Sequence, residues 1–131
     1  MIKTGYVLDA SALLAVLFME TGHEEVTAAL DGETIISAVN YSEVIARQMR
    51  LGASQQLAVS VLSGLDLKVV VWDQGLAEEA ADLSPLAKSH GLSLGDRICL
   101  ATARHLRLPV LTADREWGKL PGLGVEIRLI R

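Results

Sequence analysis

The sequence of 131 residues contains a single cysteine, Cys99, which excludes a disulfide framework and a zinc site with several cysteine ligands. Five residues are aromatic (two Trp, two Tyr and one Phe), too few for the broad stacking platforms of many proteins that bind single-stranded nucleic acids. Neither the GxxxxGK[ST] phosphate loop nor the GxGxxG turn occurs, which argues against a nucleotide cofactor. The near absence of cysteine favours a reducing compartment, and we expect a cytoplasmic protein.

Long hydrophobic runs are also missing. The apolar run Ala12–Met19 has only eight residues, lies between Asp9 and Glu20, and is not followed by a signal-peptide cleavage site. It predicts a buried helix. No other run approaches the roughly 18 to 20 apolar residues that cross a bilayer, so no membrane partner is expected.

What is present is typical of a compact fold. Half of the residues are hydrophobic and 21% are charged, a composition that excludes an intrinsically disordered chain. The length suits one domain that buries roughly two-thirds of its unfolded surface. With no linker, repeat or low-complexity tract, residues 1–131 are expected to form a single domain.

The net charge is −4, which at first argues against a nucleic-acid partner. The charges are unevenly distributed, however. Residues 1–95 carry five basic and twelve acidic side chains, whereas residues 96–131 carry seven basic and four acidic ones. The last third of the chain is therefore locally positive.

Short apolar segments alternate with helical patterns along the chain. The expected strands are 5–9, 34–37, 68–72, 109–112 and 125–130, and the expected helices are 10–19, 23–30, 41–51, 54–65, 74–90 with a break or kink at Pro85, 96–106 and 114–119. Asn40 is the expected start of the helix at 41–51, and Gly52 its end. This alternation predicts an α/β fold with a parallel sheet covered on both faces.

Four carboxylates follow strands or begin helices: Asp9, Glu43, Asp96 and Asp114. In an open α/β sheet the ligand site lies beyond the carboxyl ends of the strands, so these acids are candidates for one site. Each also has a structural explanation. Asp9, Asp96 and Asp114 suit helix N-termini, and Glu43 has capping-box spacing from Asn40, with Arg47 one turn on as an ion-pair partner.

Asp96 fits the capping explanation least well, because Cys99, Leu100 and Ala103 form an apolar face one and two turns further along its helix. This acid should point inward. Several buried carboxylates would repel one another or take up protons, and a divalent cation removes that conflict. Ligation by oxygen atoms alone suits Mg²⁺ or Mn²⁺ rather than zinc.

Four blocks of sequence, in this order, together resemble the PIN-domain ribonucleases, specifically the VapC-type toxins of toxin–antitoxin systems. They are VLDASALLA (7–15), SAVNYSEV (37–44), LGDR (94–97) and LTADREW (111–117). Residues 53–91 carry little of the resemblance.

The resemblance implies a three-layer α/β/α PIN-like fold with a central, mainly parallel sheet. It further implies that Asp9, Glu43, Asp96 and Asp114 form a catalytic tetrad that binds Mg²⁺ or Mn²⁺ and hydrolyses RNA. Ser11 and Thr112 match positions where hydroxyl groups often support the metal site of the family. An antitoxin partner and a homodimer are also implied.

A metal site changes the meaning of the net charge. Without the four proposed ligands, the chain has twelve acidic and twelve basic side chains, so an acidic protein is compatible with RNA binding. The candidates for phosphate contacts are Arg47, Arg50, Arg97 and Arg115. Which carboxylate accepts a proton, Asp96 or Glu43, stays open.

Three other functions fit the sequence less well. A phospho-receiver module needs paired acids at its start, but Asp9 has no acidic neighbour, and Val69–Asp73 is a poor match to the phosphorylated strand. A haloacid-dehalogenase-like phosphatase needs a second aspartate at the position of Ser11. A degenerate PIN domain that only binds protein is disfavoured by the complete set of acids. Cys99 is interpreted as a packing residue and not as a nucleophile.

Overall fold

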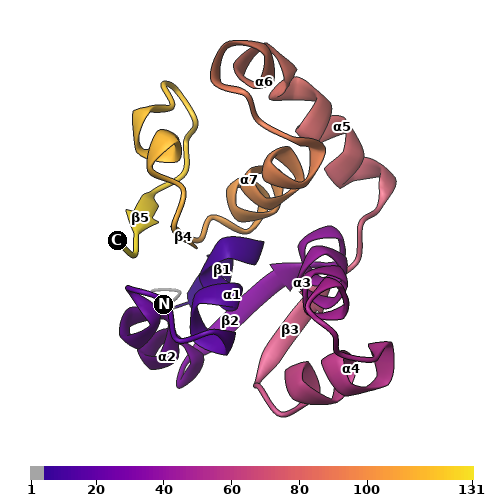
Figure 1. Ribbon diagram of the computed structural model, residues 1–131. Helices are drawn as coiled ribbons and strands as arrows, with labels where there is room; N and C mark the ends of the chain where they lie inside the picture. The colour runs from indigo at the N-terminus through magenta and orange to yellow at the C-terminus, as the bar shows by residue number, and fades with distance from the viewer. Residues whose placement is uncertain (1–4) are drawn as a thin grey trace.

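The computed structural model describes residues 5–131 (Figure 1). The strands are β1 (Gly5–Leu8), β2 (Glu33–Ser37), β3 (Leu67–Val70), β4 (Val110–Thr112) and β5 (Ile127–Leu129). The helices are α1 (Ala10–Leu17), α2 (His23–Leu30), α3 (Ala38–Arg50), α4 (Gln55–Ser63), α5 (Gln74–Asp82), α6 (Ser84–His90) and α7 (Leu94–Leu106), with a short 3₁₀ helix, η1 (Arg115–Lys119).

All five strands are parallel and lie in the order β3-β2-β1-β4-β5. The chain builds the sheet outward from β1 through β2 to β3, and then continues on the other side of β1 with β4 and β5. The strand order therefore changes direction between β1 and β4, where open α/β sheets place their ligand sites. The predicted α/β class with a central, mainly parallel sheet is confirmed.

Helices cover both faces of the sheet. Consecutive residues of a strand point to opposite faces, so each strand contributes side chains to two cores. Val7, Ile35 and Val110 pack into a core with α5, α6 and α7. Their neighbours Leu8, Ile36 and Leu111 pack into a second core with α1 to α4. Figure 1 shows the same separation, with α5, α6 and α7 together in the upper part of the view and apart from α1 to α4. The predicted three-layer arrangement is confirmed.

Two of the predicted helix starts are wrong. Helix α3 begins at Ala38 with Ser37 as its N-cap, so Asn40 is a residue inside the first turn and not the start of the helix. Helix α7 begins at Leu94 with Ser93 as its N-cap. The expected break near Pro85 is confirmed, since α5 ends at Asp82 and α6 begins at Ser84.

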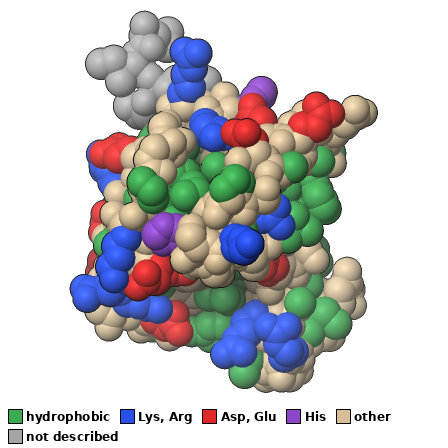
Figure 2. All heavy atoms as spheres, turned by 90° about the horizontal axis from the view of Figure 1, so that it is seen from above, with side chains coloured by type: hydrophobic (Ala, Val, Ile, Leu, Met, Phe, Trp, Pro, Cys, Tyr) green, Lys and Arg blue, Asp and Glu red, His purple; other side chains and the backbone are tan. Residues whose placement is uncertain are grey.

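The described part of the chain contains no helix with the length and hydrophobicity that a membrane crossing requires. On the face drawn in Figure 2, small groups of basic and acidic side chains are interspersed among hydrophobic ones.

Candidate functional site

The four predicted acids lie at the carboxyl edge of the sheet. Asp9 directly follows β1, and Asp114 lies two residues beyond β4. Glu43 is in the first half of α3, which follows β2, and Asp96 is in the first turn of α7. Because every strand is parallel, these four positions share one edge. Asp9 and Asp114 flank the change in strand order.

Asp9 is buried, with 6% of its surface exposed, and a network of hydrogen bonds holds its carboxylate. The Thr112 hydroxyl donates to Oδ2 at 2.6 Å, and the Ala12 N–H donates to Oδ1 at 2.9 Å. The Ser11 hydroxyl lies 2.7 Å from Oδ1 and 2.9 Å from Oδ2. We call Asp9, Ser11 and Thr112 the hydroxyl network.

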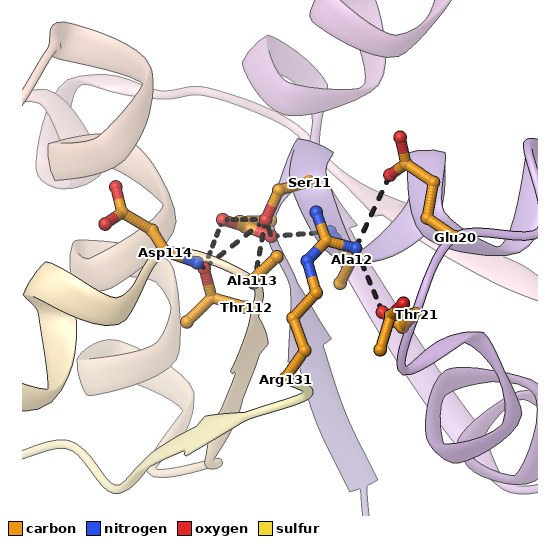
Figure 3. A network of polar contacts seen from close by, with 9 residues as sticks. Ser11, Ala12, Glu20, Thr21, Thr112, Ala113, Asp114 and Arg131 are labelled. Atoms are coloured by element: carbon orange, nitrogen blue, oxygen red, sulfur yellow. Dashed lines mark hydrogen bonds and ion pairs between the residues drawn. The ribbon is translucent and has the colours of Figure 1, made fainter.

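The hydroxyl network also fixes the chain that leads to Asp114. The Ser11 hydroxyl accepts from the Ala113 N–H at 2.9 Å, and the Thr112 hydroxyl accepts from the Asp114 N–H at 3.0 Å. Figure 3 shows these groups gathered between the start of α1 and the end of β4. Each hydroxyl therefore accepts one bond from β4's extension and directs its hydrogen at Asp9. This joins the two sides of the point where the strand order changes.

Asp9 keeps room for one more partner. Its two oxygens offer about four lone-pair sites, while Ala12, Ser11 and Thr112 each supply one hydrogen. Burial raises the pKa of Asp9 to about 6, the hydrogen bonds from Thr112, Ala12 and Ser11 oppose that rise, and the negative charge of Asp96 adds to it. A cation placed beside Asp9 would relieve the cost of its buried charge.

Glu43 is held by a different arrangement, centred on Asn40. The Asn40 amide donates to Glu43 Oε1 at 2.7 Å and to the Gly95 carbonyl at 3.1 Å, which ties α3 to the start of α7. The Ser37 hydroxyl donates to Asn40 Oδ1, and its oxygen accepts from the Asn40 N–H. We call Ser37, Asn40, Glu43 and Gly95 the Asn40 junction.

Gly95 allows α7 to approach Glu43. A Cβ atom at Gly95 would lie 2.8 Å from both carboxylate oxygens of Glu43, closer than such atoms approach in proteins. Only glycine leaves this space open. The Gly95 carbonyl, which accepts from Asn40, and the lack of a Cβ atom at Gly95 thus both help to position Glu43.

Asp96 combines a capping role with a place at the site. It forms a capping box with Ser93, in which Oδ2 accepts from the Ser93 N–H at 2.9 Å and the Asp96 N–H donates to Ser93 Oγ at 3.1 Å. Burial raises the pKa of Asp96, the bonds from Ser93 oppose the rise, and the charge of Asp114 adds to it. Asp96 is half-buried, so it points inward only in part.

Asp9 and Asp114 cap helices as well. Asp9 is the N-cap of α1, and Asp114 is the N-cap of η1, accepting from the Glu116 N–H at 3.0 Å. The capping interpretation is therefore correct for Asp9, Asp96 and Asp114. It is wrong for Glu43, because Ser37 caps α3 and Glu43 lies beyond the first turn.

Cys99 lies beneath this edge and is fully buried. Burial raises its pKa well above the ordinary value, and the charges of Asp9, Asp96 and Glu43 raise it further. The thiol is therefore protonated and unsuited to nucleophilic attack.

The donor chemistry of the edge fits a divalent cation that prefers oxygen ligands. Among residues 5–131, Glu43 Oε2, Asp96 Oδ1 and Asp114 Oδ2 accept no hydrogen bond, while the other oxygen of each carboxylate is fixed. In the same residues, no three His, Cys, Asp or Glu side chains stand close enough together to hold one ion. The carboxylates share an edge without forming a closed cage, so a shared ion requires their side chains to turn toward it.

The four arginines expected near phosphate have different surroundings. Arg97 donates to the Ala80 carbonyl at 3.5 Å, and Arg115 donates to the Arg131 carbonyl at 3.1 Å, so both contact backbone. Arg131 in turn bonds the Thr21 carbonyl and pairs with Glu20 (Figure 3). Arg47 is exposed, and its expected ion pair with Glu43 is not formed within the described chain. Arg50 lines a groove with Glu43.

Sequence reasoning missed the roles of Asn40 and Gly95 at this site. Asn40 is buried, and a buried amide must find partners, but its partner Gly95 is 55 residues away. A signal was present, since both residues lie in the blocks that carry the family resemblance. The sequence pattern does not show that α7 approaches α3 in the fold.

Comparison with solved structures finds proteins with the same fold. A toxin–antitoxin complex from Klebsiella pneumoniae matches with a TM-score of 0.74 at 21% identity, covering 97% of this chain and 98% of that one. A DNA-bound VapBC from Salmonella typhimurium matches with a TM-score of 0.75 at 18% identity, covering 98% and 100%. Mycobacterium tuberculosis VapC20, described as a sarcin–ricin loop cleaving toxin, matches with a TM-score of 0.71 at 14% identity, covering 93% and 99%.

Comparison of the sequence with known proteins gives a further result. No curated protein matches the chain. The family model for the PIN domain matches residues 6–123, a span that includes all four acids and nearly the whole described fold. The chain therefore belongs to the PIN domain family.

Proposed function

We propose that this chain is a metal-dependent endoribonuclease that hydrolyses RNA phosphodiester bonds, and that it is the toxin of a toxin–antitoxin pair. The observation that carries the proposal is the gathering of Asp9, Glu43, Asp96 and Asp114 at the carboxyl edge of the sheet. Each of these four acids also accepts at least one hydrogen bond that fixes the position of its carboxylate.

In this proposal Asp9, Glu43, Asp96 and Asp114 hold Mg²⁺ or Mn²⁺. The ion, when bound, makes water a stronger nucleophile and neutralises charge on the phosphate and the leaving oxygen. The free oxygens of Glu43, Asp96 and Asp114 and the remaining lone pair of Asp9 are the ligand atoms that support this assignment.

Neighbouring residues hold the carboxylates of the acids in position. Ser11 and Thr112 hold the Asp9 carboxylate so that little rearrangement is needed when substrate arrives. Asn40 fixes one oxygen of Glu43 and leaves the other available. In this proposal the carboxylate of Asp96 or of Glu43 would also accept the proton of the attacking water, through a lone pair that the ion does not use.

The partners are proposed from the structural neighbours. The Klebsiella structure is described as a toxin–antitoxin complex, the Salmonella structure as DNA-bound VapBC, and VapC20 as a toxin that cleaves the sarcin–ricin loop. We therefore assign this chain an RNA substrate and a cognate antitoxin protein. The homodimeric state that we also propose rests on the family resemblance of the sequence alone. At 14 to 21% identity these neighbours support the fold, and the partners follow only as part of the proposal.

The test compares the wild-type chain with Asp96→Asn, which keeps the shape of the side chain and removes its charge. Total RNA incubated with the wild-type chain and Mg²⁺ or Mn²⁺ should give discrete fragments. Asp96→Asn and added chelator should each remove cleavage. Asp66→Asn is the matched control, because Asp66 is exposed and precedes β3 at the opposite edge of the sheet. It should cleave as the wild type does.

A second measurement does not depend on activity. Mg²⁺ or Mn²⁺ should raise the thermal unfolding temperature of the wild-type chain and of Asp66→Asn, since an ion that binds only the folded state stabilises it. The increase should be smaller for Asp96→Asn. Cleavage by Asp96→Asn at the wild-type rate would disprove the assignment of the acids, and a wild-type chain that binds the ion without cutting RNA would favour a PIN domain used for protein binding.

A further inference from the structure

A groove of about 530 Å³ opens directly beside Glu43. One wall is a stripe along α3, in which Val39, Glu43, Ala46 and Arg50 follow one another at helical spacing. Trp72 also lines the groove, as do the small residues Ala38, Ser42 and Ala46. An aromatic side chain and a cation therefore line the same groove as a carboxylate of the proposed active site.

Large aromatic side chains are usually buried, but Trp72 is exposed. It is 43% exposed, whereas the other tryptophan, Trp117, is 1% exposed and packs in the core. Trp72 lies two residues beyond the end of β3, and therefore at the same edge of the sheet as the acids. Strands β3 and β1 are separated by β2 alone, so Trp72 lies roughly 10 Å along the edge from Asp9, given the usual spacing of strands.

Arg50 supplies the positive charge of the groove. It is the last residue of α3 and is exposed, and it forms no ion pair within residues 5–131. An unmatched guanidinium beside an exposed indole suits a phosphate attached to an aromatic base.

We propose that this groove binds one unpaired nucleotide of single-stranded RNA adjacent to the bond that is cut, with its base stacked on Trp72 and its phosphate paired with Arg50. The inference rests on the proposed function and adds a determinant of substrate choice to it. The nucleotide must be unpaired, because a base within a duplex is stacked on both faces and cannot lie against the indole. The enzyme therefore selects loops and single strands.

An RNA occupant explains the groove better than a protein does. A partner protein that covered Trp72 would also have to match the charges of Arg50 and Glu43, which have opposite signs and line the same short groove. An RNA strand meets both requirements, since its phosphate pairs with Arg50 and its backbone continues to the acids that hold the ion. The more exposed Val71 lines a different hollow, formed by residues of β3, α5 and α7, and provides a control outside the groove.

The experiment measures RNA affinity without cleavage. All variants are made in the Asp96→Asn chain, and binding of a fluorescent single-stranded adenosine 12-mer is followed by anisotropy at several salt concentrations. Trp72→Ala should weaken binding roughly tenfold, while Trp72→Phe, which keeps an aromatic face, should stay within about threefold of the parent. Val71→Ala is the matched control and should not change the affinity.

Arg50 is tested through the salt dependence. Loss of one phosphate contact should make the slope of log affinity against log salt shallower by about 0.7 for a single strand, so Arg50→Ala should show this change. Arg107→Ala is the control and should not show it, because Arg107 is exposed and follows α7 at the opposite edge of the sheet. Thermal unfolding of each variant checks that the fold is retained. A duplex of the same sequence should bind equally to the parent and to Trp72→Ala.

Several results would overturn the proposal. Equal affinity of the parent and Trp72→Ala would remove the stacking site while leaving the proposed ribonuclease intact, provided that wild type still cleaves total RNA. A Trp72→Ala variant with unchanged RNA affinity but an altered oligomeric state would assign the groove to a protein interface. If wild type neither binds nor cleaves RNA, the groove and the proposed function fail together.

Discussion

Asp9 and Glu43 lie beyond the carboxyl ends of neighbouring strands, β1 and β2, yet the protein holds them in different ways. Asp9 is buried and both of its oxygens accept hydrogen bonds, from hydroxyls of the hydroxyl network and from a backbone N–H. Glu43 is exposed, and a single amide of the Asn40 junction fixes one of its oxygens. The Asp9 carboxylate is therefore held at both oxygens, and the Glu43 carboxylate at one.

The difference has consequences for charge and for motion. Burial raises the pKa of Asp9 to about 6, so near neutral pH a bound proton or a neighbouring cation would stabilise its buried carboxylate. Glu43 is free to turn its second oxygen toward a ligand. The site thus joins a fixed ligand to an adaptable one, and the two networks can be broken separately.

The largest expected effect follows from filling the space at Gly95. In Gly95→Ala the new Cβ would lie 2.8 Å from the Glu43 oxygens and would displace that carboxylate from Asn40. Because a displacement of about 1 Å can cost about 100-fold in rate, RNA cleavage should fall by about that factor. The unfolding free energy should change by less than about 1 kcal/mol, because the end of a flexible side chain can move aside.

Gly75→Ala is the control for this variant. Gly75 is in helix α5, and its Cβ would meet no atom closer than 3.5 Å, so the substitution should leave cleavage unchanged and stabilise the helix by up to about 1 kcal/mol. Cleavage rates and thermal unfolding of both variants are the measurements. Full activity of Gly95→Ala would mean that the position of Glu43 does not matter.

The next effect tests the hydroxyl network through Thr112→Val. Valine keeps the shape but removes the bond to Asp9 and the acceptor of the Asp114 N–H, which should cost about 2 kcal/mol of unfolding free energy. The pKa of Asp9 should rise further, because the Thr112 hydroxyl lowers it. Thr112→Ser keeps the hydroxyl and should recover most of the loss. Chemical denaturation measures the stability, and equal stability of Val and wild type would contradict the network's role.

The smallest effect concerns pH in the presence of a chelator. The pKa of Asp9 is higher in the folded chain, about 6, than its ordinary value of 3.8, so the folded state binds more protons. Stability from this group is fully present below about pH 3.8 and is lost as the pH rises through 6. Between pH 4.5 and 7.5 the loss amounts to about 2 kcal/mol.

Asp9→Asn removes this titration and serves as the comparison. The unfolding free energy of wild type should fall relative to that of Asp9→Asn across this pH range, and saturating Mg²⁺ should reduce the fall. A pH dependence that is the same in both proteins would show that Asp9 does not carry a raised pKa.

Much of the architecture was readable from the chain. Apolar segments alternating with helical patterns predicted the parallel sheet, because strands buried on both faces need apolar residues at consecutive positions, as in Val7-Leu8 and Ile35-Ile36. The start of α3 was predicted wrongly because Asn40 and Glu43 have the spacing of a capping box, while Ser37, three residues earlier, competes for the same backbone groups.

Local patterns and the parallel direction of the strands were enough to predict the fold class, the edge of the sheet at which the four acids lie, and the helices that Asp9, Asp96 and Asp114 cap. Three further features became visible only in the folded chain: Thr112 and Ser11 bind Asp9, Asn40 reaches Gly95, and Trp72 and Arg50 line one groove. Those contacts join residues far apart in the chain, and their geometry depends on how closely helices pack on the sheet, which no local pattern records.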